Sequence, residues 1–402
     1  MLRSFFLTLA VLSAAACSNV LARNPAPANL AGIASPYGIE SESLFLRSWG
    51  DEFEPNGVGR AALENFASRV RKTNEDSIRD DGRIRHAMLA LSGGGADGAF
   101  GAGLLAGWTK RGDRPEFSTV TGVSTGAIIA LYAFLGPDYD DVLREVYTEY
   151  ETSQLLERTL LSALTGGAAV TATAGYKGLI ERYVDEDVMQ RLREASDNGR
   201  TLLIGTTNLD AARPVIWNVS SIAATRHPQA EKLIEDIIRA SSAIPGVFPP
   251  VLIPVVSADG ETYDEMHVDG GATQQVMLFS PGYPLDRIDK AVGAQIKREL
   301  YVVMNNKLDK PYRPVAPRLI PIASAAASSL LGGSGTGDIY KIFAIAERDE
   351  IDLNVVTIPE GFDAEAEEVF DPEYMTELYK LGFDMIQQPD IWSKYPPGFV
   401  PD

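Results

Sequence analysis

The chain has 402 residues, of which 45% are hydrophobic, and it contains 15 Phe, 15 Tyr and 4 Trp. This composition is sufficient for a sizeable core and excludes global disorder. The formal net charge of −19 disfavours a nucleic-acid partner and electrostatic binding to anionic lipids, since both need clustered Lys and Arg. We therefore expect no nucleic-acid partner, and any membrane association must come from a feature other than a basic patch.

The first residues have the pattern of a secretion signal. Residues 1–16 carry one basic residue, Arg3, and an apolar stretch that is too short to span a bilayer, which predicts a signal peptide. Cys17 is the only cysteine, so no internal disulfide is expected. Residues 14–17 resemble a bacterial lipobox, and Ser18 resembles an outer-membrane sorting signal. The expectation is a lipoprotein anchored through acylated Cys17 and facing the periplasm; ordinary signal-peptide cleavage, giving a periplasmic or secreted protein, stays open.

The next segments differ in composition. Residues 17–40 are predicted to be a tether, because Asn24–Pro36 is rich in Ala, Pro and Asn without apolar periodicity. Residues 41–86 are expected to form a helical extension, with helical spacing over 43–72 and a polar loop over 74–85.

From residue 87 the pattern indicates alternating strands and helices. A strand is predicted at 87–91, a glycine turn at 93–98, a helix at 99–110, a strand at 118–123 and a helix at 125–135. This order indicates βαβ units and an α/β fold with a mainly parallel sheet. Further helices are predicted at 138–151, 154–164, 177–195 and 231–242, and further strands at 201–207, 214–219, 263–268, 300–304 and 351–358. Residues 323–337 fit either a mobile segment or a packed helix.

The glycine turn has the sequence GGGADG at residues 93–98, which matches G-x-G-x-x-G. A dinucleotide site would need an acidic residue at the end of the second strand, and that strand ends instead in Gly122-Val123-Ser124. The turn is not a phosphate-binding P-loop, because no Gly-Lys-Ser/Thr follows. Backbone N–H groups of glycines at a helix N-terminus can also stabilise an oxyanion. An oxyanion hole is the better interpretation of this turn if a nucleophile lies nearby.

Residues 122–126 supply a candidate nucleophile. The sequence Gly122-Val123-Ser124-Thr125-Gly126 is G-x-S-x-G between a predicted strand and a predicted helix, which is the context of a nucleophile elbow. Ser124 would attack, and the N–H of Thr125 would assist the glycine loop. The competing interpretation is a plain turn with Ser124 as helix N-cap.

A serine nucleophile needs a base, and the chain offers few. His86 precedes the first core strand, and His227 lies in a predicted surface loop. His267 and Asp269 lie on the same side of one predicted strand, which ends in Gly270-Gly271. Asp269 is thus placed to face a cleft, or else only to cap the glycine turn.

In these motifs the chain resembles the patatin-like phospholipases. Four motifs agree in order over residues 87–310: the glycine loop with Gly98, the elbow with Gly122 and Gly126, the segment 240–250, and Asp269-Gly270-Gly271. The resemblance implies a three-layer α/β/α catalytic domain over 87–310, completed by 311–402. It also implies a lipid ester hydrolase with a Ser124–Asp269 dyad, without metal or cofactor, and an oxyanion hole formed by Gly93, Gly94, Gly95 and Thr125.

Two alternatives stay open beside this interpretation. One is a Ser-His-Asp esterase that uses His267 or His227. The other is a non-catalytic, lipid-binding or scaffolding envelope lipoprotein, suggested by Asp97, which stands where the family usually has Arg or Lys. If Asp97 faces the site, its charge would disfavour an anionic phosphate headgroup; if it caps the following helix, it would not.

Overall fold

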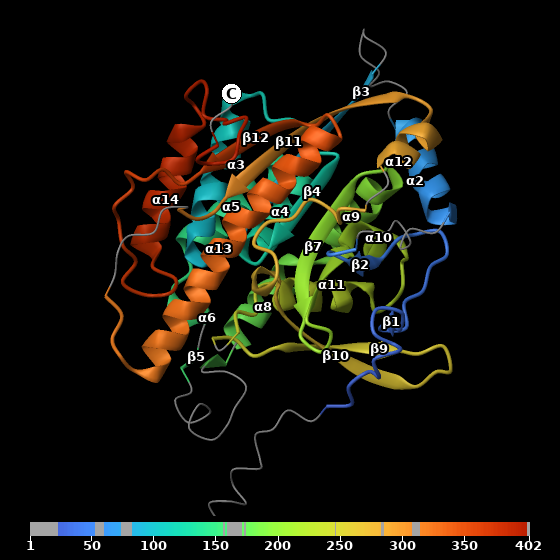
Figure 1. Cartoon of the computed structure of the whole chain (residues 1–402), viewed down its shortest axis with the longest axis horizontal. Coiled ribbons are helices and arrows are strands. Elements are labelled where there is room, and N and C mark those ends of the chain that lie inside the picture. The colour runs from blue at the N-terminus through green and yellow to red at the C-terminus, as the bar shows by residue number, and fades with distance from the viewer. Residues whose placement is uncertain are drawn as a thin grey trace, which may run out of the picture.

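The structure is a computed structural model that describes residues 23–52, 60–73, 83–155, 157–158, 171–172, 174–245, 247–282, 285–307 and 314–399 (Figure 1). Its centre is a ten-stranded sheet in the order β1-β9-β10-β7-β4-β3-β11-β12, with β8 and β2 added beside β7. The strands are β1 Ser35–Pro36, β2 Arg47–Trp49, β3 Arg83–Leu91, β4 Thr119–Val123, β7 Thr201–Asn208, β8 Arg213–Asn218, β9 Val251–Val256, β10 Thr262–Asp269, β11 Gln295–Met304 and β12 Asp352–Thr357.

The five strands β7, β4, β3, β11 and β12 are parallel to their neighbours in this series, which confirms the predicted mainly parallel sheet. The remaining strands pair antiparallel on the side of β7. They matter for the site because β10, which carries His267 and Asp269, pairs directly with β7.

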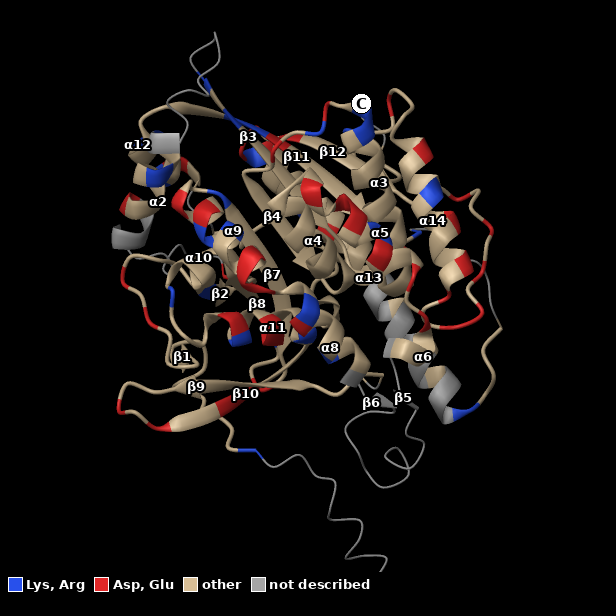
Figure 2. Ribbon diagram, turned by 180° about the vertical axis from the view of Figure 1, so that it is seen from behind, with Lys and Arg blue, Asp and Glu red and all other residues tan. Residues whose placement is uncertain are grey.

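Helices cover both faces of the sheet. They are α2 Arg60–Thr73, α3 Gly98–Arg111, α4 Thr125–Leu135, α5 Asp140–Thr148, α6 Thr152–Leu155, α8 Ala174–Tyr183, α9 Glu186–Asp197, α10 Val219–Ala224, α11 Ala230–Ser241, α12 Leu285–Val292, α13 Leu319–Arg348 and α14 Pro372–Met385. Figure 1 shows α13 in front of the sheet, and Figure 2, from behind, shows α3, α4, α5 and α11 on the other face. The fold is therefore an α/β fold with helical layers on both faces, as predicted.

The alternation of side chains along β3 explains the two layers. Leu89 and Leu91 belong to the large core cluster under α3 and α4, whereas Met88 and Ala90 pack with Ile342 of α13 on the opposite face. A strand with both faces buried has apolar residues at consecutive positions, as this one does.

Several predicted elements differ in detail. Residues 177–195 form two helices instead of one, because Asp185 begins α9 by accepting a hydrogen bond from the Val188 N–H. The helix predicted over 154–164 is wrong where it can be checked, since α6 ends at Leu155 and residues 157–158 form a strand, β5, paired with β6, Thr171–Ala172. Residues 323–337 lie within the helix α13.

The N-terminal region also departs from prediction. Asn24–Pro36 is not a free tether: β1 pairs with β9, and Arg23 forms ion pairs with Asp210 and Asp264. Among the described residues of 43–72, which exclude 53–59, β2 pairs with β8 and only α2 is helical. Composition misses these contacts because their partners lie far away in the sequence. Residues 1–22, with Cys17 and the predicted signal peptide, and most of the loop at 74–85 lie outside the described residues.

Acidic residues are distributed over many of the helices, including α5, α11 and α14 (Figure 2). None of the described helices is both long enough and apolar enough to cross a membrane.

Candidate active site

The sharp turn between β4 and α4 places Ser124 at the carboxyl end of the parallel strands. Ser124 has φ 56° and ψ −128°, a backbone conformation that non-glycine residues rarely adopt and that is common at strained functional sites. Gly122 and Gly126 pack directly on each other, because a Cβ on Gly122 would lie 2.2 Å from the Gly126 carbonyl oxygen. The Ser124 side chain makes no helix-capping hydrogen bond, so the N-cap interpretation is wrong.

The Ser124 hydroxyl is bonded to the carboxylate of Asp269. Its Oγ donates to Asp269 Oδ2 over 2.6 Å, and the two residues are only 6% and 5% exposed. The sheet register brings them together: Val123 lies opposite Gly205 of β7, and the next residue of β7, Thr206, lies opposite Asp269. Two residues 145 positions apart thus meet across one strand.

The surroundings of Asp269 keep its carboxyl group protonated at a higher pH than is usual for Asp. Burial raises the pKa of Asp269 to about 7, although hydrogen bonds from Ser124 and from the Gly271 N–H favour the ionised form. The Gly271 bond, 2.7 Å long, caps the short helical turn Gly270–Ala272, so Asp269 is both a turn cap and the partner of Ser124. A carboxylate with a pKa near neutrality is suited to accept a proton from an alcohol.

The glycine loop follows β3 and reaches the same edge of the sheet. A Cβ on Gly94 would lie 1.9 Å from the Asn305 carbonyl oxygen, so only glycine fits there. The Gly93 N–H donates to the Gln275 carbonyl oxygen over 2.9 Å and is not available to a substrate, which corrects its expected place in the oxyanion hole. In the described part of the chain, the N–H groups of Gly94, Gly95 and Thr125 have no hydrogen-bond partner.

The start of α3 packs against the start of α4. A Cβ on Gly98 would lie 2.3 Å from Thr125 Oγ1, and the Tyr147 hydroxyl is bonded to both the hydroxyl and the carbonyl oxygen of Thr125, over 2.5 and 2.9 Å. Tyr147 of α5 thereby fixes the first turn of α4. The N-termini of α3 and α4, each favourable to negative charge, therefore lie next to each other.

Two buried residues that the sequence motifs did not reveal, Asn305 and Gln275, hold the loops. Asn305, which is 0% exposed, accepts from the Gly101 N–H over 3.1 Å and donates from its side chain to the Ser92 carbonyl oxygen over 2.9 Å. Gln275 contributes mainly through its backbone: its carbonyl oxygen accepts from the Gly93 N–H, and its backbone N–H donates to Asp338 of α13 over 2.7 Å. Its side-chain amide donates to the Gly271 carbonyl oxygen over 3.4 Å. The signal in the sequence was weak: Asn305 directly follows a strand, and Gln275 lies four residues after Gly271.

The last residue of α11 and the residue after it are bonded to the elbow. Ser241 accepts from the Ser124 N–H over 2.9 Å and donates to the Gly205 carbonyl oxygen over 2.7 Å. The Ser242 hydroxyl lies 3.4 Å from the Ser124 carbonyl oxygen. The similarity of residues 240–250 to the family segment therefore has a physical basis in this structure; Gly246 lies outside the described residues.

Asp97 does not act as a helix cap. Its carboxylate accepts from the Tyr374 hydroxyl of α14 over 2.7 Å and makes no capping bond to α3. Burial raises the pKa of Asp97, while the Tyr374 bond and the charge of Lys307 oppose this shift. Asp97, which stands where the family usually has Arg or Lys, is thus hydrogen-bonded to the C-terminal part of the chain.

None of the histidines is bonded to Ser124. His267, which is 0% exposed, bonds to Thr206 over 2.9 Å and to Glu265 over 3.2 Å, and burial lowers its pKa. His86 bonds to Thr119, and His227 accepts from a neighbouring backbone N–H. Within the described ranges, no cluster of three or more His, Cys, Asp or Glu side chains is arranged to hold a metal ion.

Comparison with known proteins agrees with this geometry. Residues 89–279 match the family model of the patatin-like phospholipases, so a domain of this kind is present in the chain. A curated relative is an uncharacterized protein of Acanthamoeba polyphaga mimivirus, 26% identical over 236 residues, which are 58% of this chain and 69% of the viral protein.

Two solved structures show weaker likeness. VipD from Legionella pneumophila has a TM-score of 0.37 and 14% identity, over 75% of this chain and 66% of the VipD chain. Human GIVD cytosolic phospholipase A2 has a TM-score of 0.32 and 11% identity, over 80% of this chain and 53% of the human chain. The chain thus spans just under two thirds of the first structure and about half of the second.

Proposed function

We propose, from the patatin-like domain of residues 89–279, that this chain is a serine hydrolase that cleaves carboxylic esters of lipids. The observation that carries the proposal is the 2.6 Å hydrogen bond between the hydroxyl of Ser124 and the buried carboxylate of Asp269. Ser124 is the nucleophile and Asp269 is its base, in a dyad without histidine. The substrate class is a phospholipid, a lysophospholipid or another lipid ester.

The reaction proceeds in two halves. Asp269 accepts the hydroxyl proton while Ser124 Oγ bonds to the ester carbonyl carbon, and the charge that develops on the carbonyl oxygen is stabilised by the N–H groups of Gly94, Gly95 and Thr125. The intermediate then releases the alcohol, which takes the proton from Asp269, and an acyl group stays on Ser124. Water, deprotonated by Asp269, then attacks the carbonyl carbon of this acyl-enzyme. The bond between that carbon and Ser124 Oγ breaks, Asp269 returns the proton to Oγ, and a carboxylic acid leaves.

The test compares hydrolysis of p-nitrophenyl butyrate by the wild type with that by Ser124→Ala, with Ser153→Ala of α6 as a matched control at an exposed serine. We expect Ser124→Ala to lose turnover and also labelling by a fluorophosphonate probe, and the control to keep both. A panel of phospholipids, lysophospholipids and neutral esters then identifies the substrate. Turnover by Ser124→Ala at the wild-type rate would refute the proposal.

The histidine alternative makes a different prediction. A dyad keeps its turnover in His227→Ala, and His267→Gln, which retains a polar side chain between Thr206 and Glu265, still reacts with the fluorophosphonate. Loss of fluorophosphonate labelling in a folded His267→Gln protein would favour a Ser-His-Asp esterase instead.

We also propose that the mature protein is a lipoprotein of a bacterial envelope, anchored at Cys17. The support is the apolar segment before Cys17 and the small residues at 14–16. Labelled palmitate should enter the protein expressed in a bacterial host and should not enter Cys17→Ala. Equal labelling of both proteins would exclude acylation at this position.

A further inference from the structure

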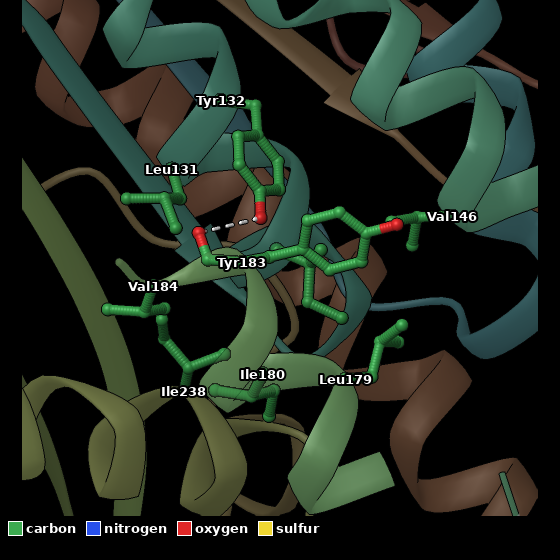
Figure 3. A pocket seen from close by; sticks show the side chains of 9 residues that line it. Leu131, Tyr132, Val146, Leu179, Ile180, Tyr183, Val184 and Ile238 are labelled. Carbon is green, nitrogen blue, oxygen red and sulfur yellow. Dashed lines mark hydrogen bonds between the residues drawn. The ribbon is translucent and has the colours of Figure 1, made fainter. Parts of the chain in front are cut away.

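The proposed site brings together the start of a helix and two short turns. Ser124 directly precedes α4, whose side chains Leu131 and Tyr132 lie among the apolar side chains of α8 and α11 (Figure 3). The glycine loop and the turn that begins at Asp269 each form only a single turn of 3-10 helix. Packing of long helices therefore fixes the nucleophile, whereas contacts from other segments decide how the two turns lie beside it.

Gln275 contacts both of these turns. Its carbonyl oxygen accepts from the Gly93 N–H over 2.9 Å, and a Cβ on Gly93 would lie 2.9 Å from Gln275 Oε1 and 3.2 Å from Ser124 Cβ. Its side-chain amide donates to the Gly271 carbonyl oxygen over 3.4 Å, and the Gly271 N–H donates to Asp269 Oδ1 over 2.7 Å. Gln275 thus joins the glycine loop to the turn that carries the base.

The segment that carries Gln275 is buried without being part of a helix or strand. Residues 274–280 form neither element, so a regular ladder of backbone hydrogen bonds does not hold them. The N–H groups of Gln275 and Val276 donate instead to one carboxylate oxygen of Asp338, Oδ2, over 2.7 and 3.4 Å. A buried N–H without an acceptor is unfavourable, and a charged acceptor makes a stronger bond than a neutral one. Asp338 therefore holds this segment at the residue that reaches both turns.

Asp338 belongs to α13, outside the residues that match the family model, and the proposed reaction gives this helix no role. Asp338 is 8% exposed, and the Ser334 hydroxyl lies 3.4 Å from the same carboxylate oxygen. Burial raises the pKa of Asp338 to about 6, while the N–H groups of Gln275 and Val276 and the charge of Lys341 favour the ionised form. Above neutral pH, Asp338 is thus a charged acceptor.

We propose that Asp338 is a positioning residue for the proposed reaction: through Gln275, it holds the glycine loop and the turn of Asp269 in register with Ser124. The inference rests on the proposed function and adds a residue of α13 to it. Among the described hydrogen bonds of Asp338, none goes to Ser124 or Asp269, so it acts only through geometry.

The expected effect is on kcat. The N–H groups of Gly94 and Gly95 follow Gly93 in the chain, and a displacement of about 1 Å in a catalytic site costs about a hundredfold in rate. Bonds to the oxyanion are made in the transition state and not in the ground state, so their loss lowers kcat and leaves KM nearly unchanged.

The experiment compares three variants of α13. Asp338→Leu removes the acceptor, Asp338→Asn keeps a neutral acceptor, and Ile342→Ala, one turn further along, removes buried volume from the same helix while leaving Asp338 in place. For each folded protein, kcat and KM on p-nitrophenyl butyrate and the rate of fluorophosphonate labelling are measured at about pH 8, above the pKa values of Asp338 and Asp269, and well below the melting temperature.

We expect Asp338→Leu to lower kcat by about ten- to a hundredfold with KM nearly unchanged, and to slow labelling by a similar factor. Asp338→Asn should lose less, about three- to tenfold, because its acceptor is uncharged. Ile342→Ala should lower the melting temperature and keep the wild-type kcat.

Wild-type kcat and labelling in folded Asp338→Leu, with Ser124→Ala inactive, would overturn the positioning role alone. The same holds if Ile342→Ala loses as much kcat as Asp338→Leu, since the loss would then follow from destabilisation of α13. If Asp338→Leu does not fold, the kcat of Asp338→Asn decides, and a wild-type value overturns the proposal. An active Ser124→Ala would instead overturn the proposed function.

Discussion

In the proposed mechanism, Asp269 is the residue that accepts the proton of Ser124, so its ionisation determines the pH at which the reaction can proceed. Because burial raises its pKa to about 7, the base form is lost as pH falls through neutrality. We predict that kcat/KM on p-nitrophenyl butyrate rises about tenfold per pH unit below a midpoint of about 7 and then reaches a plateau. A midpoint near 4, the ordinary value for Asp, would contradict this environment.

The same shift has a consequence for stability, which provides a control. The folded-state pKa of Asp269 lies above the unfolded value, so the folded state binds the proton more tightly and loses stability as pH rises from about 4 to about 7. Asp269→Asn removes the buried charge, and it should raise the melting temperature relative to the wild type more at about pH 8 than at about pH 5.

Tyr374 donates a hydrogen bond to Asp97, which lies in the glycine loop. Tyr374→Phe removes the hydroxyl and leaves a partly buried carboxylate without this donor, so we predict a loss of about 1–2 kcal/mol in unfolding free energy. If the bond also positions Gly94 and Gly95, kcat should fall while KM changes little. Tyr340→Phe is the matched control, since that exposed hydroxyl bonds to a C-terminal carbonyl far from the loop in sequence.

At the scale of elements, β2 is joined to the antiparallel side of the sheet by a buried ion pair. Arg47 of β2 donates to both carboxylate oxygens of Glu265 over 2.7 and 3.2 Å, and also to the Ala34 carbonyl oxygen. Burial disfavours ionised Glu265, but the bonds from His267 and Arg47 outweigh it and hold the pKa of Glu265 at about 2. Glu265 therefore anchors β2 and β10 while it remains charged.

Removing one partner of this pair leaves a buried charge. We predict that Arg47→Leu lowers the unfolding free energy by about 3–5 kcal/mol at neutral pH, measured by urea denaturation. The pKa of Glu265 is depressed in the folded state, so the stabilisation is present above about pH 4.5 and is lost as pH falls toward 2, and the difference between wild type and variant should shrink over that range. The double variant Arg47→Leu/Glu265→Gln should recover part of the loss; no recovery would contradict the uncompensated charge.

For the whole molecule, the C-terminal part packs directly on the helix that follows the glycine loop. α14 packs so closely on α3 that a Cβ on Gly103 would lie 1.9 Å from the Tyr379 carbonyl oxygen, and Met375 and Leu378 belong to the main core cluster. We predict a single unfolding transition for the full chain and loss of cooperative unfolding when residues 350–402 are removed. A folded protein without β12 and α14 would show that the domain ends earlier.

Local patterns in the sequence were sufficient for the central α/β unit. Three continuous stretches of sequence define this unit: the apolar run at 87–91, the glycine loop and the G-x-S-x-G turn. Each forms its structure for a reason that neighbouring residues show, because consecutive apolar residues bury both faces of a strand and glycines allow the close approaches at the turns. The arrangement of β3, α3, β4 and α4 could therefore be predicted, with element ends displaced by at most a few residues.

Only the tertiary structure decided what the partners of these motifs are. Side-chain alternation places His267 and Asp269 on the same side of one strand, and only the register of β10 on β7 brings Asp269 to Ser124 and leaves His267 against Thr206. In the same way, the contact of Asp97 with α14, the loss of Gly93 as a donor and the docking of Asn24–Pro36 on the sheet each depend on residues more than 150 positions away. Such pairings are chosen by the packing of the whole chain, because no local propensity distinguishes one distant hydrogen-bond partner from another.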